Sequence, residues 1–241
     1  MAAINRFVTN LDLIPDADDI KYDENIGFAL SYPLRADQGV LEYFDGEVTV
    51  VRSEDEFFAD FGEPLEQGDL VITGPDTVAV IQLNSRAQVK LRENTKLWID
   101  SLVEQASQVS LDTGGVFAKV TRVAGIAAGA EEFKVRTPTV VAGVRGTEFF
   151  VAYGRTVEEE PDLWLCVNEG SVEVSVPTTG QSVVVEEGEG INILSGLRAT
   201  DPKFYPWTQK LNWNFDSESG EVFDDTNLDE AYADLLDQDY D

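Results

Sequence analysis

Apolar and polar positions alternate with a period of two along most of the chain between about residues 40 and 193. The alternating segments are short, are rich in Val, Ile, Thr and aromatic residues, and are separated by glycine-containing turns. This periodicity is typical of β-strands with one buried face. The clearest segments are residues 47–51, 78–83, 88–91, 96–99, 115–120 and 171–176. The pattern therefore predicts an all-β fold built from short strands.

A weak internal repeat places an acid and a glycine directly before a strand. Asp45-Gly46-Glu47 is echoed by Glu169-Gly170-Ser171, and Glu66-Gln67-Gly68 is echoed by Glu186-Glu187-Gly188. Glycine supplies the positive φ that a tight turn requires. Short strands that follow tight turns either stack as rungs of a β-solenoid or close as a compact sandwich. Both architectures remain open at this point.

The flanks differ from the β region, so we expect three parts: an N-terminal arm at residues 1–39, a β domain at residues 40–195 and an aromatic, acidic C-terminal tail at residues 196–241. The tail contains Trp207, Trp213 and Phe215. A dense set of aromatic side chains is unstable in water. We therefore expect these aromatics to lie across the β core or over its open end.

One short helix is predicted near the C-terminus. Thr226 fits a helix cap, and Leu228, Tyr232, Leu235 and Leu236 follow at helical spacing. A nine-residue helix is not stable alone in water. The helix must therefore dock either on its own β core or on a partner surface such as a neighbouring subunit. We favour the partner surface, which makes these four apolar residues candidate partner-binding residues.

The charge balance is strongly acidic, with 46 acidic and 17 basic side chains and a formal net charge of −29. Such a chain repels nucleic acid and anionic membranes at long range, and it lacks the clustered Lys and Arg that bind phosphates. Cationic partners fit this balance. Acidic clusters near Asp16 and Asp216 allow a calcium site, although neither has the residue order of an EF-hand.

The chain has no histidine and one cysteine, Cys166. These two counts exclude Ser-His-Asp and Cys-His catalysis and zinc sites that need histidine or several cysteines. Many enzyme classes are therefore closed, and we expect no cofactor and no zinc centre, although a carboxylate pair for glycoside hydrolysis stays open. Cys166 lies in an apolar run and is expected to be a buried small apolar residue.

No run of about 18 apolar residues is present, and the first residues do not form a signal peptide. We therefore expect no membrane insertion. Two locations fit: the cytoplasm, or the exterior of the membrane after removal of a leader.

The most specific segment of the chain is residues 133–149, in which a strand, a Thr137-Pro138 turn and the run Val144-Arg145-Gly146-Thr147-Glu148-Phe149 follow in this order. This segment resembles the signature of the FecR domain. Further matching elements extend the resemblance over about residues 40–195; they are residues 45–48, 65–69, 73–77, 94–95, 114–116, 169–172 and 187–190.

The resemblance implies a β-rich, non-catalytic module that lies outside the cytoplasm, in the periplasm or on the cell surface. FecR domains occur in envelope signalling and in surface-associated proteins. In the sigma-regulating members the domain relays contact with an outer-membrane receptor through a transmembrane helix to an anti-sigma segment. This sequence has neither of those two parts.

The motif residues Thr137, Pro138, Arg145, Gly146, Thr147 and Glu148 are expected to hold the fold. The Arg145 guanidinium would lie against backbone carbonyls or against a carboxylate such as Glu148 or Asp69. The alternative is that Arg145 clamps an anion or a substrate.

Three functional hypotheses follow. The first is a structural or protein-binding component of the bacterial envelope or cell surface that can self-associate. The second is a surface protein that binds polysaccharide, or less readily cleaves it, and uses Trp98, Trp164, Trp207 or Trp213 as a sugar platform. The third is a shortened envelope-signalling regulator.

Overall fold

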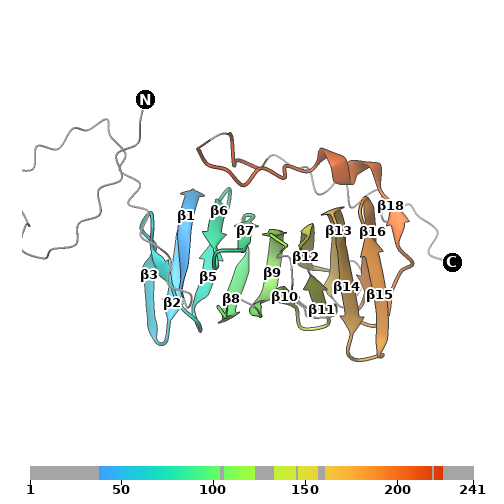
Figure 1. The fold of residues 1–241 in the computed structure, drawn as a ribbon. Coiled ribbons are helices and arrows are strands. Elements are labelled where there is room, and N and C mark those ends of the chain that lie inside the picture. Colours follow the sequence, from blue (N-terminus) through green and yellow to red (C-terminus); the bar gives the residue numbers. More distant parts are fainter. Residues whose placement is uncertain are drawn as a thin grey trace, which may run out of the picture. The chain divides into compact units, whose positions relative to one another are not determined.

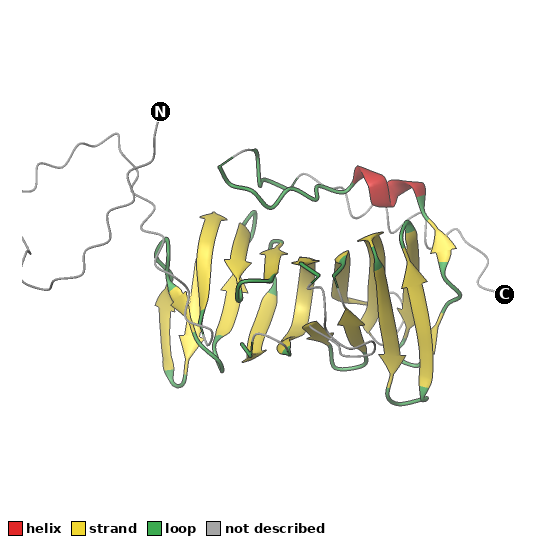
Figure 2. Cartoon of the chain, viewed as in Figure 1, coloured by secondary structure: helices red, strands yellow, loops and turns green. Residues whose placement is uncertain are grey.

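The computed structural model describes residues 38–103, 106–122, 133–144, 146–156, 161–218 and 220–224, all within the unit Leu34–Asp241. These residues form β-strands and one 3-10 helix, η2 (Pro206–Lys210), as Figure 2 shows. The all-β prediction is confirmed. Residues 1–37 of the predicted arm and the predicted helix at residues 228–236 lie outside the described residues, and Gly39, placed in the arm, is the first residue of a strand.

The strands belong to two sheets. Sheet I contains, in spatial order, β4 (Pro64–Leu65), β1 (Gly39–Asp45), β6 (Val78–Gln82), β7 (Ala87–Leu91), the second half of β9 (Ser107–Val120), β12 (Glu148–Thr156), β13 (Pro161–Glu169) and β16 (Glu189–Leu194), and β16 also pairs with β17 (Arg198–Ala199) and β18 (Lys203–Phe204). Sheet II contains β3 (Asp55–Phe58), β2 (Val48–Arg52), β5 (Leu70–Thr73), β8 (Lys96–Ser101), the first half of β9, β10 (Phe133–Arg136), β11 (Val141–Val144), β14 (Ser171–Val176) and β15 (Gln181–Glu186).

Strand β9 joins the two sheets. Its first residues pair with β8 and β10, and its residues from Gly114 onward pair with β7 and β12. The change of sheet occurs at Gly114, which has a φ of 99°. A Cβ at this position would lie 2.3 Å from Oγ1 of Thr95. Glycine is therefore required here for both its backbone conformation and its lack of a side chain.

The architecture combines both alternatives that the sequence left open. The chain advances along the two sheets nearly in sequence order, as in a solenoid, and the colours of Figure 1 follow this order. Neighbouring strands are nevertheless antiparallel, as in a sandwich, except for the parallel pair β9 and β10. Hairpins within one sheet alternate with turns that cross to the other sheet. This alternation gives both the sequential order of a solenoid and the antiparallel pairing of a sandwich.

The core lies between the sheets and is built from the inward positions of the alternating strands. Typical fully buried members are Leu41, Val50, Leu97, Phe149 and Ile193, which come from both sheets. The outward positions of sheet I carry a second apolar cluster, which residues after β18 cover. We call residues 205–224 the C-terminal strap; Figure 1 shows it running back along the sandwich from β18.

Candidate interaction surfaces

The Gly146-Thr147 pair of the motif forms a tight corner between β11 and β12. Gly146 has a φ of 65°, and a Cβ there would lie 2.4 Å from the Cβ of Arg122. The buried Thr147 donates from its hydroxyl to the carbonyl of Ser171 at 3.0 Å and exchanges two backbone hydrogen bonds with Val120. These contacts connect the corner to β9 through Val120 and to β14 through Ser171. Arg145 lies outside the described residues, so its predicted role stays a prediction.

The other motif residues also contact neighbouring chain. The Thr137 N–H donates to the carbonyl of Val140 at 2.9 Å and closes the turn that contains the exposed Pro138. The Glu148 carboxylate pairs with Nζ of Lys119 at 2.6 Å and accepts from Nδ2 of Asn168 at 2.9 Å. The other carboxylate suggested for Arg145, that of Asp69, accepts two hydrogen bonds from Arg52.

Corners of the same kind recur along the sandwich, and sequence reasoning missed them. Thr77, Thr95 and Thr147 each follow a residue with positive φ, namely Asp76 (50°), Asn94 (55°) and Gly146 (65°). All three threonines are buried. The available signal was a threonine that follows Asp, Asn or Gly and directly precedes a strand, because Asp, Asn and Gly tolerate the left-handed region. The repeated corner explains why Thr77, Thr95 and Thr147 are buried although they are polar.

The outer face of sheet I is closed by the C-terminal strap. The sheet contributes Phe117, Phe150, Ala152, Trp164 and Cys166, and the strap contributes Tyr205, Leu211, Phe215 and the partly buried Trp213. Trp213 meets Phe117 edge to face, with ring centroids 5.1 Å apart. The expected position of Trp213 and Phe215 across the core is confirmed, whereas the Trp207 side chain lies outside what the structure describes. Cys166 is buried as expected, and burial raises the pKa of its thiol to about 12.

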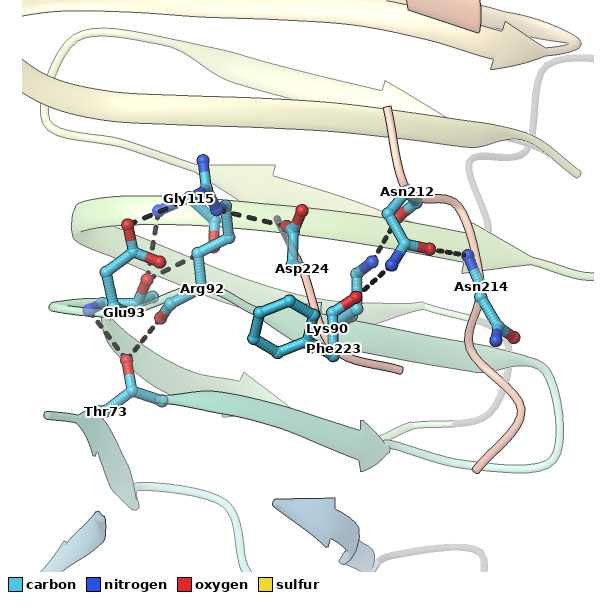
Figure 3. A network of polar contacts seen from close by, with 10 residues as sticks. Thr73, Lys90, Arg92, Glu93, Gly115, Asn212, Asn214, Phe223 and Asp224 are labelled. Carbon is cyan, nitrogen blue, oxygen red and sulfur yellow. Dashed lines mark hydrogen bonds and ion pairs between the residues drawn. The ribbon is translucent and has the colours of Figure 1, made fainter. Parts of the chain in front are cut away.

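Lys90 is fully buried beneath the strap. Its Nζ lies 4.2 Å from the centroid of the Phe117 ring and 5.8 Å from that of Phe215, and it donates to the carbonyl of Asn212. Burial lowers the pKa of Lys90 to about 8, although the negative charge of Asp224 opposes the shift. Figure 3 shows Lys90 directed at the strap.

A second buried cation fixes the end of the strap. Nε of Arg92 lies 3.2 Å from Oδ2 of Asp224, and the two side chains are 7% and 2% exposed. Nδ2 of Asn212 donates to the carbonyl of Phe223, and Nδ2 of Asn214 donates to that of Glu221. The strap therefore folds back on itself as a hairpin (Figure 3). A partner could reach this face of sheet I only by displacing the strap.

The outer face of sheet II is open over its first half. Trp98 is 37% exposed, and its indole N–H donates to Oδ2 of Asp112 at 2.9 Å. Strand register places Leu70 beside Trp98, Val51 beside Leu70, and Ile72 one pair further along the strands, so all four side chains share this face. We call Val51, Leu70, Ile72 and Trp98 the Trp98 face. Two exposed cations, Lys96 and Arg136, lie on the same side of the sheet.

The structure describes three of the four tryptophan side chains suggested as a sugar platform, and that of Trp207 lies outside the described residues. Trp164 is 2% exposed and packs against Phe150, and Trp213 packs against Phe117. Of the three indole side chains that the structure describes, that of Trp98 is the most exposed.

Within the described ranges, no group of three or more His, Cys, Asp or Glu side chains is placed to hold a metal ion. No helix in these described ranges is long and apolar enough to cross a membrane.

Comparison with known proteins finds one matching family model and two similar solved structures. The family described as FecR protein matches residues 69–173. Two crystal structures of a candidate anti-sigma factor from Parabacteroides distasonis share 20% sequence identity with the chain, with TM-scores of 0.49 and 0.47. Each match covers 69% of this chain and 72% of the solved one. No curated protein matches the sequence.

Proposed function

The chain contains a FecR domain, and from this premise we propose that it is a non-catalytic, protein-binding regulator of envelope signalling. The family match over residues 69–173 is the observation that supports this proposal. It favours the regulator over the two other hypotheses, a self-associating structural component and a polysaccharide-binding protein. The proposed location is the periplasm or the cell surface, where FecR domains act.

The Trp98 face is the proposed contact with the signalling partner. It lies almost wholly within the matched region, whereas the strap already occupies the outer face of sheet I. A large, partly exposed indole that is fixed by a hydrogen bond and lies beside aliphatic side chains is the kind of group that dominates protein interfaces. The sheet fixes these side chains before binding, which lowers the entropy lost in the complex.

The rim of this face carries charges of both signs, and its cations suit a partner with some negative charge. Lys96 and Arg136 are exposed there, while Oδ2 of Asp100 accepts hydrogen bonds from Gln108 at 2.9 Å and from Ser110 at 2.6 Å. The carboxylate is thus satisfied within the face, and the two cations remain available to steer association. Such steering matters because the chain as a whole repels anions.

Genetic complementation in the native organism tests the proposal. Deletion of the gene should change transcription of a discrete set of genes, measured by RNA sequencing, and the wild-type gene should restore it. Trp98→Ala should fail to restore it at normal protein levels. Phe204→Ala, at an exposed aromatic of β18 on sheet I, is the matched control and should complement. An unchanged transcriptome with increased detergent sensitivity would instead indicate a structural component.

A further inference from the structure

Strand β3 forms one edge of sheet II. Within the described residues it pairs only with β2, with Arg52 opposite Asp55 and Val50 opposite Phe57. The Ala59 N–H donates to the carbonyl of Val48, which continues the same ladder. Because hydrogen-bonded pairs alternate in an antiparallel ladder, the backbone groups of Glu56 and Phe58 point away from β2. The edge therefore presents donors and acceptors to a further strand.

A network around Arg52 holds this edge in place. Its guanidinium donates to both carboxylate oxygens of Asp69 at 2.9 and 2.7 Å and to the carbonyl of Pro64 at 2.8 Å. Its Cζ also lies 5.7 Å from the centroid of the Phe57 ring. The hydrogen bonds link the hairpin to two later segments. A strand that is fixed in this way loses little entropy when it pairs with a partner.

The side chains at the edge are unusual for an unpaired strand. Phe58 is 70% exposed and Phe61 is 67% exposed. Natural edge strands usually carry charges that discourage pairing, and large exposed apolar side chains do the opposite. Residues 54–63 also contain five acids and no basic residue. The edge thus combines apolar contact area with a local negative charge.

Charge excludes the ligands that the chain itself could supply. Residues 1–37 contain seven acids and three bases, and residues 225–241 contain seven acids and no base. A second copy carries a net charge of −29. Like charges placed along paired strands are destabilising. The occupant that fits is a segment of a different protein with positive charge.

We propose that the β3 edge is a second binding site, which takes an extended cationic and apolar segment of a partner protein by strand addition. The segment accepts from and donates to the backbone of Glu56 and Phe58. Its apolar side chains contact Phe58 and Phe61, and its Lys or Arg residues meet the surrounding acids. The site lies outside residues 69–173, so it adds to the FecR-matched region and is separate from most of the Trp98 face.

A peptide experiment with a backbone readout tests this site. The probe is a capped eight-residue peptide of alternating lysine and valine, and a lysine–proline peptide of equal length and charge is its control, because proline cannot donate to a ladder. Amide exchange at Glu56 and Phe58, followed by NMR, should slow by about tenfold with the first peptide and remain unchanged with the second.

Substitutions separate strand addition from adsorption to an acidic surface. Glu56→Pro removes the outward N–H, whereas Glu56→Ala removes the same charge and keeps the N–H. We expect Glu56→Pro to bind the lysine–valine peptide with an affinity about tenfold lower than that of Glu56→Ala. Phe58→Ser should also weaken it, and Val184→Ser, at an exposed residue of the other edge strand β15, should not.

Equal binding of the two peptides, or unchanged exchange at Glu56 and Phe58, would overturn the proposal. Equal affinity of Glu56→Pro and Glu56→Ala, with melting temperatures that match the wild type, would also overturn it. Trp98→Ala should leave peptide binding intact, so the failure of this site and the failure of the proposed regulatory function can be told apart.

Discussion

The two outer faces of the sandwich differ in what covers them. On sheet I, β12 and β13 are apolar at consecutive positions, in Phe149-Phe150-Val151-Ala152 and Leu163-Trp164-Leu165-Cys166-Val167, and both sides are buried. On sheet II, β14 alternates buried valines with exposed or half-exposed Ser and Glu. A continuous apolar run indicates a strand covered on both faces, and alternation indicates one face in water.

The difference teaches that the strap is a third layer of the fold over sheet I. It covers aromatic rings, and it also encloses the charged groups of Lys90, Arg92 and Asp224. Burying charges is costly unless they are paired or hydrogen-bonded. The strap supplies those partners through Asn212 and Asp224. Within the part of the chain that the structure describes, no such layer covers the first half of sheet II, and this outer face is the one we assign to a partner.

Removal of residues 205–241 should have the largest effect. It would expose the ring cluster of sheet I and leave Lys90 and Arg92 without the strap. At about 1.5–3 kcal/mol for each large side chain uncovered, the free energy of unfolding should fall by more than about 5 kcal/mol. Urea unfolding and dye binding to exposed apolar surface measure this effect.

The matched control is removal of residues 225–241 alone, which keeps the strap and should change stability far less. Equal urea midpoints for the two truncated chains and the full chain would show that the strap is not part of the folded unit. The conclusion that the strap forms a structural layer over sheet I would then be wrong.

Asp224→Asn should have the next largest effect, because it leaves Arg92 buried without its carboxylate. Breaking a buried ion pair from one side typically costs about 3–5 kcal/mol. Glu93→Gln is the matched control, since Glu93 contacts the same guanidinium at 3.4 Å but is 40% exposed. Its loss should cost less than about 1 kcal/mol. Similar urea midpoints for the two variants would indicate that the end of the strap is solvated.

The sequence could predict the features that depend on local pattern. Period-two alternation identified the strands, and the density of aromatics after Gly196 indicated that Trp213 and Phe215 pack on the core. The resemblance carried by residues 133–149 agreed with the family match. These features are local because the side-chain period of a strand and the clustering of apolar residues are properties of a short segment.

Long-range contacts could not be predicted. Lys90 stands in an alternating segment, Gln88-Val89-Lys90-Leu91, where the pattern assigns it to a solvated face. It is buried because Asn212, 122 residues later, lies over it. No local pattern records such a partner. The pairing of Arg92 with Asp224 was missed for the same reason, and β9 gave no periodicity signal that it changes sheet at Gly114.

Lys90→Met should give a smaller effect that depends on pH. In the folded chain the pKa of Lys90 is about 8, against 10.5 for an unperturbed lysine. Between these values the unfolded chain binds more protons than the folded chain, so the stability that Lys90 contributes rises with pH. At pH 7 the buried charge is a cost, and the apolar variant should be at least as stable as the wild type.

Raising the pH from 7 to 10 should therefore increase the free energy of unfolding of the wild type, relative to that of Lys90→Met, by roughly 2 kcal/mol. Urea unfolding of both proteins at the two pH values measures this, and the difference between them removes the contribution of all other titrating groups. A difference that stays constant with pH would mean that water reaches Lys90 and that the strap does not seal sheet I.

Trp98→Ala should have the smallest effect on stability, and this result would sharpen the contrast most. Trp98 is 37% exposed and hydrogen-bonds to the exposed Asp112, so its loss should cost at most about 1 kcal/mol. The buried Trp164 on sheet I is the matched position, where Trp→Ala should cost about 3–5 kcal/mol. Acrylamide quenching of tryptophan fluorescence gives an independent measure, because removal of Trp98 should lower the quenchable fraction and removal of a buried indole should not. A loss of several kcal/mol for Trp98→Ala, with no change in quenching, would mean that another segment covers this face. The partner contact assigned to it would then have to be placed elsewhere.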